Sequence, residues 1–211
     1  ASETDHQQYL AVLKAKLPSL EELGFESIGP AIGQELRVKA IWAFVLVLVT
    51  ISLYIAFAFR KVSRPVNSWK YGLITLVTLF HDAIIPAGLF AYLGSIFGLE
   101  VGINFIVAIL VVIGFSVHDT IVVFDRIREN LRLEKSPSFN FAELVNKSVL
   151  QTFARSVNTS LTLVLVLLAL YFFGSFSLTY FVLTILVGTV VGTYSSIFVA
   201  SPLLVIWSKR I

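Results

Sequence analysis

Long apolar runs separated by short polar segments dominate the chain after its first few dozen residues. Five of these runs are long enough for a helix, which rises about 1.5 Å per residue, to cross a hydrocarbon core of about 30 Å. The pattern therefore predicts an all-α polytopic membrane protein, with residues 37–211 as its transmembrane domain. The predicted spans are residues 40–59, 71–94, 101–124, 149–173 and 178–206.

Residues 1–36 differ from the rest because they are polar and contain several Gly and Pro residues. Leucines at helical spacing predict a short amphipathic helix from His6 to Leu17, and residues 24–28 are expected to form a strand. Such a segment is too small to fold alone. The chain also lacks Met, so we expect residues 1–36 to be the α/β C-terminal remnant of an external domain that begins upstream.

Basic residues are confined to alternate connections between the spans. The connections at residues 60–70 and 125–148 carry several Lys and Arg residues, as does the C-terminus, whereas those near residues 95–100 and 174–177 carry none. Cytoplasmic loops of membrane proteins are enriched in Lys and Arg. We therefore expect the N-terminal tail to lie outside and the C-terminus to lie in the cytoplasm.

The basic loop at residues 125–148 also contains helix signals. Charges three residues apart, beginning at Asp125, favour a helix that emerges into water. Asn140 and Glu143 resemble a capping arrangement, and an apolar stripe follows them. This second part of the loop is expected either to lie on the membrane surface or to form a solvated linker helix.

Small residues recur every four positions in the fifth predicted span, at Gly188, Gly192, Ser196 and Ala200. A face of small side chains lets two membrane helices approach closely. We expect this stripe to serve helix packing.

Composition supports the membrane interpretation and excludes several function classes. The chain is 57% hydrophobic and 14% charged, with a mean hydropathy of +0.87. A soluble domain of this size would need far more surface charge. The sequence has no cysteine, and it contains no nucleotide-binding loop, catalytic triad or nucleic-acid surface. We therefore expect neither an enzyme nor a nucleic-acid-binding protein.

Several ionisable side chains fall inside the predicted spans, foremost Asp119 and Arg155. A charged residue at the centre of a membrane helix costs roughly 2.5–3.5 kcal/mol on insertion scales, so it suggests a function. Both residues lie about 27 Å below the outer membrane edge at the rise of an α-helix. We expect them to pair if their helices are neighbours.

A carboxylate beside an arginine stays ionised, and it binds a proton more readily when the arginine withdraws. One charge crossing 100 mV releases about 2.3 kcal/mol. Asp119 and Arg155 are therefore predicted to form a proton relay. The alternative is a fixed ion pair that holds two helices together.

Weaker candidates surround this predicted pair. Asp82 could be a second relay group or could hydrogen-bond to backbone that Pro86 frees. His81 and His118 could share protons, or could be satisfied within the bundle. The remaining candidates are Asn158, Thr159, Ser160 and Thr162, which are expected to hydrogen-bond the pair or a bridging water. No spacing specifies a metal site, so we expect no cofactor, with protons as the coupling ion.

The segment GFSVHDTIVVFDRIREN, residues 114–130, closely resembles the signature of the SecF family, the smaller subunit of the SecD–SecF protein-export complex. Three further pieces are similar to the same family: residues 28–37, His81-Asp82, and residues 155–162. The resemblance extends from about Ile28 to the C-terminus.

This resemblance implies six spans, paired with a six-span half from SecD in an RND-like bundle. The chain would then be half of such a bundle without its first span. The resemblance also implies a complex that uses the proton gradient to help pull preproteins outward after they cross the Sec channel. The family's proton carrier falls on Asp119 and its arginine on Arg155, while many members have asparagine where this chain has His118.

The partners implied by the resemblance are a SecD-like subunit, the Sec translocon channel, an unfolded preprotein and the lipid bilayer, with no nucleic acid. The implied location is the plasma (inner) membrane of a prokaryote. Two alternatives remain open at this point. One is an RND-like proton-coupled exporter of lipids or small molecules, and the other is a non-transporting membrane scaffold.

Overall fold

The computed structural model describes residues 3–18, 20, 30–60, 65–99, 101–134 and 139–208. Regular secondary structure in these residues is helical, and they contain no strand. Helix α1 (Glu3–Lys16) confirms the predicted N-terminal helix, whereas the predicted strand lies outside the described residues. The chain forms two compact parts, residues 1–43 and 44–211, and each is described by itself.

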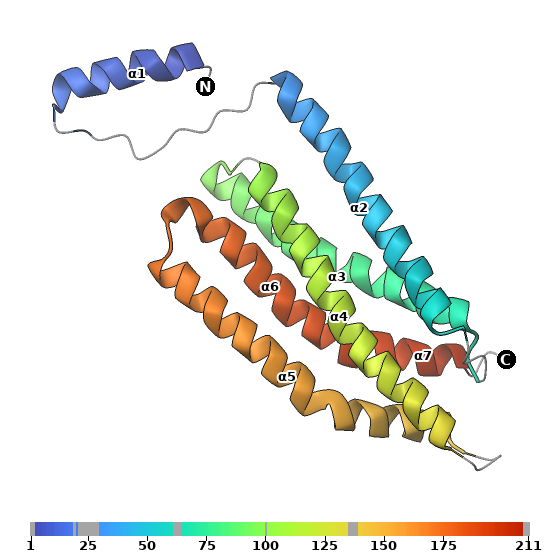
Figure 1. Cartoon of the computed structure of the whole chain (residues 1–211). Helices are drawn as coiled ribbons and strands as arrows, with labels where there is room; N and C mark the ends of the chain where they lie inside the picture. The colour runs from blue at the N-terminus through green and yellow to red at the C-terminus, as the bar shows by residue number, and fades with distance from the viewer. Residues whose placement is uncertain are drawn as a thin grey trace. The chain divides into compact units, whose positions relative to one another are not determined.

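Five helical segments in the described ranges are long and apolar enough to cross a membrane, which confirms the number of predicted spans (Figure 1). The first four are single helices, and the fifth is an unbroken run of three pieces. The segments are α2 (Pro30–Ala58), α3 (Ser68–Phe97), α4 (Ile103–Leu133), α5 (Phe141–Phe173), and the run of α6 (Thr179–Ser195), η2 (Ser196–Ala200) and α7 (Ser201–Ser208). A short 3-10 turn, η1 (Phe176–Leu178), joins α5 to α6.

Helix α4 continues beyond the predicted span into the predicted basic loop at residues 125–148. Ion pairs between side chains one turn apart line this extension. Arg126 Nη1 lies 2.6 Å from Glu129 Oε2, and Arg128 pairs with Asp125. Pairs at this spacing stabilise a helix by a few tenths of a kcal/mol each. The charge spacing therefore correctly predicted that the helix would continue.

Helix α5 begins at Phe141 because Asn140 caps its N-terminus. Asn140 Oδ1 accepts a hydrogen bond from the backbone N–H of Ala142 at 3.1 Å. Asn140 Nδ2 donates to Glu143 Oε1, also at 3.1 Å. The cap supplies an acceptor for a backbone N–H that has no partner within the helix. The predicted capping arrangement is confirmed.

Helix α6 packs against α3, α4 and α5, and its small residues bring it close to α4. A Cβ atom at Gly188 would lie 2.2 Å from Val112 Cγ2. One at Gly192 would lie 3.0 Å from Ser116 Cβ. At these two positions the small-residue stripe is a packing surface, as expected, and it places Ser116 next to α6.

The fifth span contains one π-helical turn, η2, between α6 and α7. Pro202 lies just after this turn and has no backbone N–H to donate. Ser201 Oγ donates to the backbone carbonyl of Ser196, five residues earlier, at 3.0 Å. Single π turns inside α-helices are frequent at functional sites. The π turn η2 begins at Ser196.

An aromatic cluster joins the end of α2 to α3 and α4. The ring centroid of Tyr71 lies 5.1 Å from that of Phe59 and 5.3 Å from that of Phe124. All three side chains are buried. Arg128 Nη1 donates to the carbonyl of Ala58 at 3.4 Å beside this cluster. These contacts fix α3 and α4 side by side, as the functional site requires.

Candidate functional site

Two aspartates within membrane-spanning helices are buried in the helix bundle. Asp82 of α3 is fully buried, and Asp119 of α4 is 5% exposed. A buried carboxylate is strongly unfavourable unless hydrogen-bond donors satisfy its oxygens. Both carboxylates find donors on the fifth span, where α6 meets η2.

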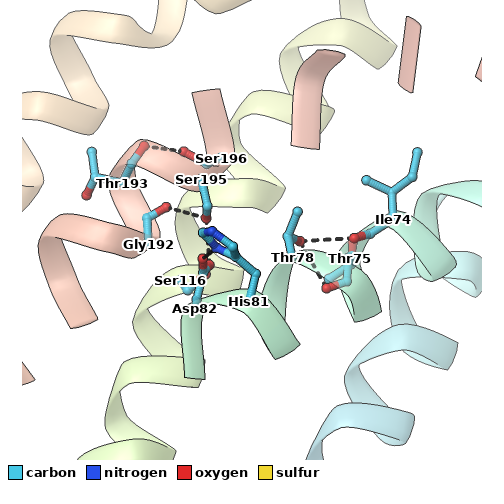
Figure 2. Close-up of polar contacts among 10 residues, drawn as sticks. All are labelled: Ile74, Thr75, Thr78, His81, Asp82, Ser116, Gly192, Thr193, Ser195 and Ser196. Atoms are coloured by element: carbon cyan, nitrogen blue, oxygen red, sulfur yellow. Dashed lines mark hydrogen bonds and ion pairs between the residues drawn. The ribbon is translucent and has the colours of Figure 1, made fainter. Parts of the chain in front are cut away.

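Three side chains hold the Asp82 carboxylate (Figure 2). Ser195 Oγ donates to Asp82 Oδ2 at 2.6 Å, and Ser116 Oγ donates to the same oxygen. His81 Nδ1 lies 2.8 Å from Asp82 Oδ1. The His81 side chain is 35% exposed, so its ring connects a fully buried carboxylate with the edge of the bundle.

Pro86 does not determine the side-chain bonding of Asp82. Because proline has no N–H, Pro86 leaves the backbone carbonyl of Asp82 without its helical donor. Within the described ranges, the carboxylate nevertheless bonds only to hydroxyl and imidazole groups. Of the two interpretations that the sequence left open, bonding to the freed backbone does not occur in this structure.

Among the described residues, a single serine holds the Asp119 carboxylate. Ser196 Oγ donates to Asp119 Oδ2. Ser196 directly follows Ser195, and consecutive residues of a helix point about 100° apart. Two adjacent hydroxyls therefore reach acids on two different helices, Asp82 on α3 and Asp119 on α4.

Each of these two serines also has a second acceptor within hydrogen-bond distance. Ser195 Oγ lies 3.1 Å from the carbonyl oxygen of Gly192, and Ser196 Oγ lies 3.0 Å from that of Thr193. Figure 2 shows these contacts on the turn before the two serines. A hydroxyl carries one hydrogen, so it donates fully to only one acceptor at a time.

Thr193 extends these contacts to α5, because its hydroxyl hydrogen-bonds to that of Ser160. These side chains form three hydrogen-bonded groups, around Asp82, around Asp119 and between Thr193 and Ser160, which meet on neighbouring residues of the fifth span. We term the three groups together the polar network. Its members are His81, Asp82, Ser116, Asp119, Ser160, Thr193, Ser195 and Ser196.

Besides the Tyr71 hydroxyl of the aromatic cluster, three buried hydroxyls have no hydrogen-bond partner within the described part of the chain: Thr120, Ser156 and Thr189. Thr120 follows Asp119, and Ser156 lies one turn before Ser160 of the polar network. Buried hydroxyls of this kind commonly bind internal water. They are therefore suited to extend a hydrogen-bonded path from the polar network.

The expected pair of Asp119 and Arg155 is not formed in this structure. Arg155 is exposed on α5, and it takes part in none of the ion pairs between described residues. Helix α5 turns Thr152, Ser156 and Ser160 into the bundle. Arg155, one position before Ser156, points about 100° away from that face. The sequence placed Asp119 and Arg155 at the same depth in the membrane, but depth does not show toward which side of its helix a side chain points.

The weaker candidates divide into two groups. His81 and Asp82 lie together in the polar network, whereas His118, Asn158 and Thr159 are exposed side chains. Among the described residues, these exposed side chains and that of Thr162, also exposed, form no hydrogen bond or ion pair with either buried acid. Ser160, the other candidate on this helix, hydrogen-bonds to Thr193.

Sequence reasoning did not identify Ser116 or Ser195 as site residues, and it assigned Ser196 only to packing. The available signal was the pair of adjacent serines within an otherwise apolar span. Serine is also a common packing residue in membrane helices, so this signal could not be distinguished from packing without knowledge of the neighbouring helices.

The sequence matches the family described as protein export membrane protein SecD/SecF, C-terminal, over residues 8–210. It is 52% identical to protein translocase subunit SecF of Thermobaculum terrenum over 94% of the chain and 61% of that protein. It is 46% identical to protein translocase subunit SecDF of Thermus thermophilus over 89% of the chain and 24% of that protein. The chain thus spans less than two thirds of the length of each relative.

A solved structure has the same arrangement of helices. It is the crystal structure of SecDF in a super-membrane-facing form, with a TM-score of 0.74 and 39% sequence identity. The likeness covers 100% of this chain and 27% of that chain. The membrane region of that structure and the helices described above therefore share one fold.

Proposed function

The chain belongs to the SecD/SecF family of protein-export membrane proteins, and on that basis we propose that it is a SecF-like subunit of a proton-driven complex that assists Sec-dependent translocation. Protons are the coupling ion, and Asp119 is the principal proton carrier. The proposed partners are a SecD-like subunit, the Sec channel and an unfolded preprotein. Residues 1–36 belong to an external domain, and the C-terminus is cytoplasmic.

The observation that carries this proposal is the burial of two carboxylates, Asp82 and Asp119, in apolar membrane-spanning helices. Acids inside membrane spans are costly, and they commonly mark ion paths and proton relays. Their serine partners suit that role because a hydroxyl donates to an ionised carboxylate and accepts from a protonated one. Both states are therefore possible at the same site.

Proton binding at such a site supplies a driving force for movement. One charge that crosses 100 mV releases about 2.3 kcal/mol, and each 1.4 kcal/mol changes an equilibrium constant about tenfold. One proton therefore changes the balance of two helix arrangements by about 50-fold. In the proposed cycle, this change is transmitted to the external domain, which pulls the preprotein outward.

The exposed side chains of α5 support the proposed SecD-like partner. Arg155, Asn158 and Thr159 are exposed within a membrane-spanning helix. A guanidinium that faces lipid tails is unfavourable by a few kcal/mol, so intramembrane charges usually face other protein. In the proposed complex, the partner covers this face of α5, and Arg155 approaches Asp119 in only part of the cycle.

Substitution of Asp119 by Asn in the complete complex tests the proposal. The amide keeps the shape but cannot exchange a proton, so both proton flux into membrane vesicles and export of a secretory preprotein should fall at least tenfold. Asp125→Asn is the matched control, because Asp125 lies on the same helix with a half-exposed side chain and should leave both rates unchanged.

The two alternative functions give different results in this experiment. A scaffold would tolerate Asp119→Asn in both assays. An exporter of lipids or small molecules would lose proton flux with the substitution but leave preprotein export unchanged. Either result would contradict the proposed function.

A further inference from the structure

We propose that Ser195 and Ser196 are positioning residues that adapt to the protonation state of Asp82 and Asp119. Each serine reverses the direction of its hydrogen bond when its acid gains or loses a proton, so the acid stays bonded in both states. The inference rests on the proposed function in one respect, which is that these acids exchange protons.

The structure shows the geometry suited to the ionised acids. Ser195 Oγ donates to Asp82 Oδ2 at 2.6 Å, and Ser196 Oγ donates to Asp119 Oδ2. A hydrogen bond to a charged acceptor is roughly twice as strong as one between neutral groups. When the carboxylate is charged, each serine therefore directs its hydrogen to the acid and not to the helix backbone.

The same atoms also accommodate the neutral acids. A protonated carboxyl becomes a donor, and the serine oxygen then accepts its hydrogen. The serine hydrogen needs another acceptor, which is the carbonyl of Gly192, 3.1 Å from Ser195 Oγ, or of Thr193, 3.0 Å from Ser196 Oγ. The switch requires only rotation of the hydroxyl hydrogen. The incoming proton stays on the carboxyl oxygen, and no serine O–H bond breaks.

The two acids differ in how far they depend on this switch. Asp82 has a second serine donor, Ser116, whose only hydrogen bond within the described ranges goes to Asp82. Asp82 therefore keeps Ser116 and His81 as partners whatever Ser195 does. Asp119 has Ser196 as its single donor among the described residues, so its proton affinity should be the more sensitive to loss of its serine.

The surrounding charges favour Asp119 as the acid to test. The titratable groups near this level on the packed helices are His81 and Asp82 on α3, His118 on α4, Arg155 on α5 and Tyr194 on α6. Within the described structure, His81 hydrogen-bonds to Asp82, and His118, Arg155 and Tyr194 are exposed and form no hydrogen bond or ion pair with either acid. Among the described residues, Asp119 therefore forms no ion pair with a charged side chain, and its hydrogen bond runs to Ser196.

Infrared spectroscopy of the complete complex in lipid vesicles would follow this titration directly. The carbonyl band of protonated Asp119 is identified as the signal that Asp119→Asn removes. In Ser196→Ala, the pH of half-protonation should rise by about one unit, because the lost donor favoured the charged form. Ser196→Thr keeps a hydroxyl and should stay within about 0.3 unit of the wild type.

Ser201→Ala is the matched control. Ser201 follows η2 and donates to the carbonyl of Ser196, not to an acid, so the midpoint should not move. If Ser196→Ala does not accumulate in the membrane, Ser196→Cys replaces it. A thiol is a weak donor, so Ser196→Cys should also raise the midpoint, by less than one unit.

The outcomes separate this inference from the proposed function. If Asp119 titrates but its midpoint does not move in Ser196→Ala, the serine switch is wrong and the proton carrier stands. If no Asp119 band titrates and Asp119→Asn transports normally, the proposed function fails and the switch fails with it. A loss of thermal stability with an unmoved midpoint would indicate a purely structural serine, which also overturns the inference.

Discussion

At Asp82, one fully buried carboxylate satisfies three donors at once. Replacing Asp82 by alanine removes the acceptor oxygens, whereas replacing it by asparagine removes the charge but keeps one acceptor oxygen. The two substitutions should therefore have different effects on stability. Ser195 can turn to the carbonyl of Gly192 at 3.1 Å, whereas Ser116 has no such alternative within the described part of the chain. A buried donor that loses its acceptor costs about 1–3 kcal/mol. The structure thus identifies Ser116 as the group that would be left unsatisfied.

Asp82→Ala should consequently destabilise the folded complex by about 2 kcal/mol. Asp82→Asn should destabilise it by less than about 1 kcal/mol, because the amide oxygen still accepts a hydrogen bond from Ser116. Denaturant unfolding of the purified complex measures both changes. Asp125→Ala, at a half-exposed position, is the control and should be neutral. Equal losses for the alanine and asparagine variants would show that the hydrogen bond from Ser116 does not stabilise the fold.

Helix α6 is the element that brings the two acids into one network. It packs against α3, α4 and α5, and this close approach depends on glycine. At Gly188 an added Cβ would lie 2.2 Å from the Val112 side chain. The glycine therefore sets the distance between α6 and α4, and with it the reach of Ser196 toward Asp119.

Gly188→Ala should cost about 1–3 kcal/mol through overpacking. The double variant Gly188→Ala/Val112→Ala should recover about half of this loss, because the smaller side chain makes room for the new Cβ. Gly114→Ala is the control, since no atom lies within 4 Å of the Cβ position there. Unfolding free energies of the wild type, Gly188→Ala, Val112→Ala and the double variant measure the coupling. Additive losses in the double variant would contradict the packing role.

The sequence correctly predicted which helices form, but it did not predict which side of each helix faces the rest of the bundle. Apolar length correctly indicated five spans, and the signals at Asn140 and along α4 correctly indicated helices in the basic loop. Depth suggested a pair between Asp119 and Arg155, yet α5 turns Ser156 inward and Arg155 outward. Rotation depends on which neighbouring side chains interlock, and the sequence of one helix does not contain that information.

In the transmembrane part of the chain, residues 44–211, the connections that carry Lys and Arg lie at one end of the helix bundle. Lys70 at the start of α3 donates to the carbonyl of Trp207 near the end of α7 at 3.3 Å. At the other end, Phe97 of α3 and Tyr180 of α6 lie with ring centroids 6.4 Å apart. The connections near these two aromatic residues carry no Lys or Arg.

This separation of charge makes membrane orientation testable with single cysteines, since the chain itself contains none. Asn67 and Ser177 are exposed at opposite ends of the bundle. If the basic end is cytoplasmic, Ser177→Cys should react with an impermeant maleimide in intact cells. Asn67→Cys should react only after permeabilisation. Both substitutions should be tolerated, because Asn67 makes no capping hydrogen bond and, among the described residues, the Ser177 hydroxyl hydrogen-bonds only to Ser175. The opposite labelling pattern would place the proposed external domain in the cytoplasm, which would contradict the proposed outward pulling of a preprotein.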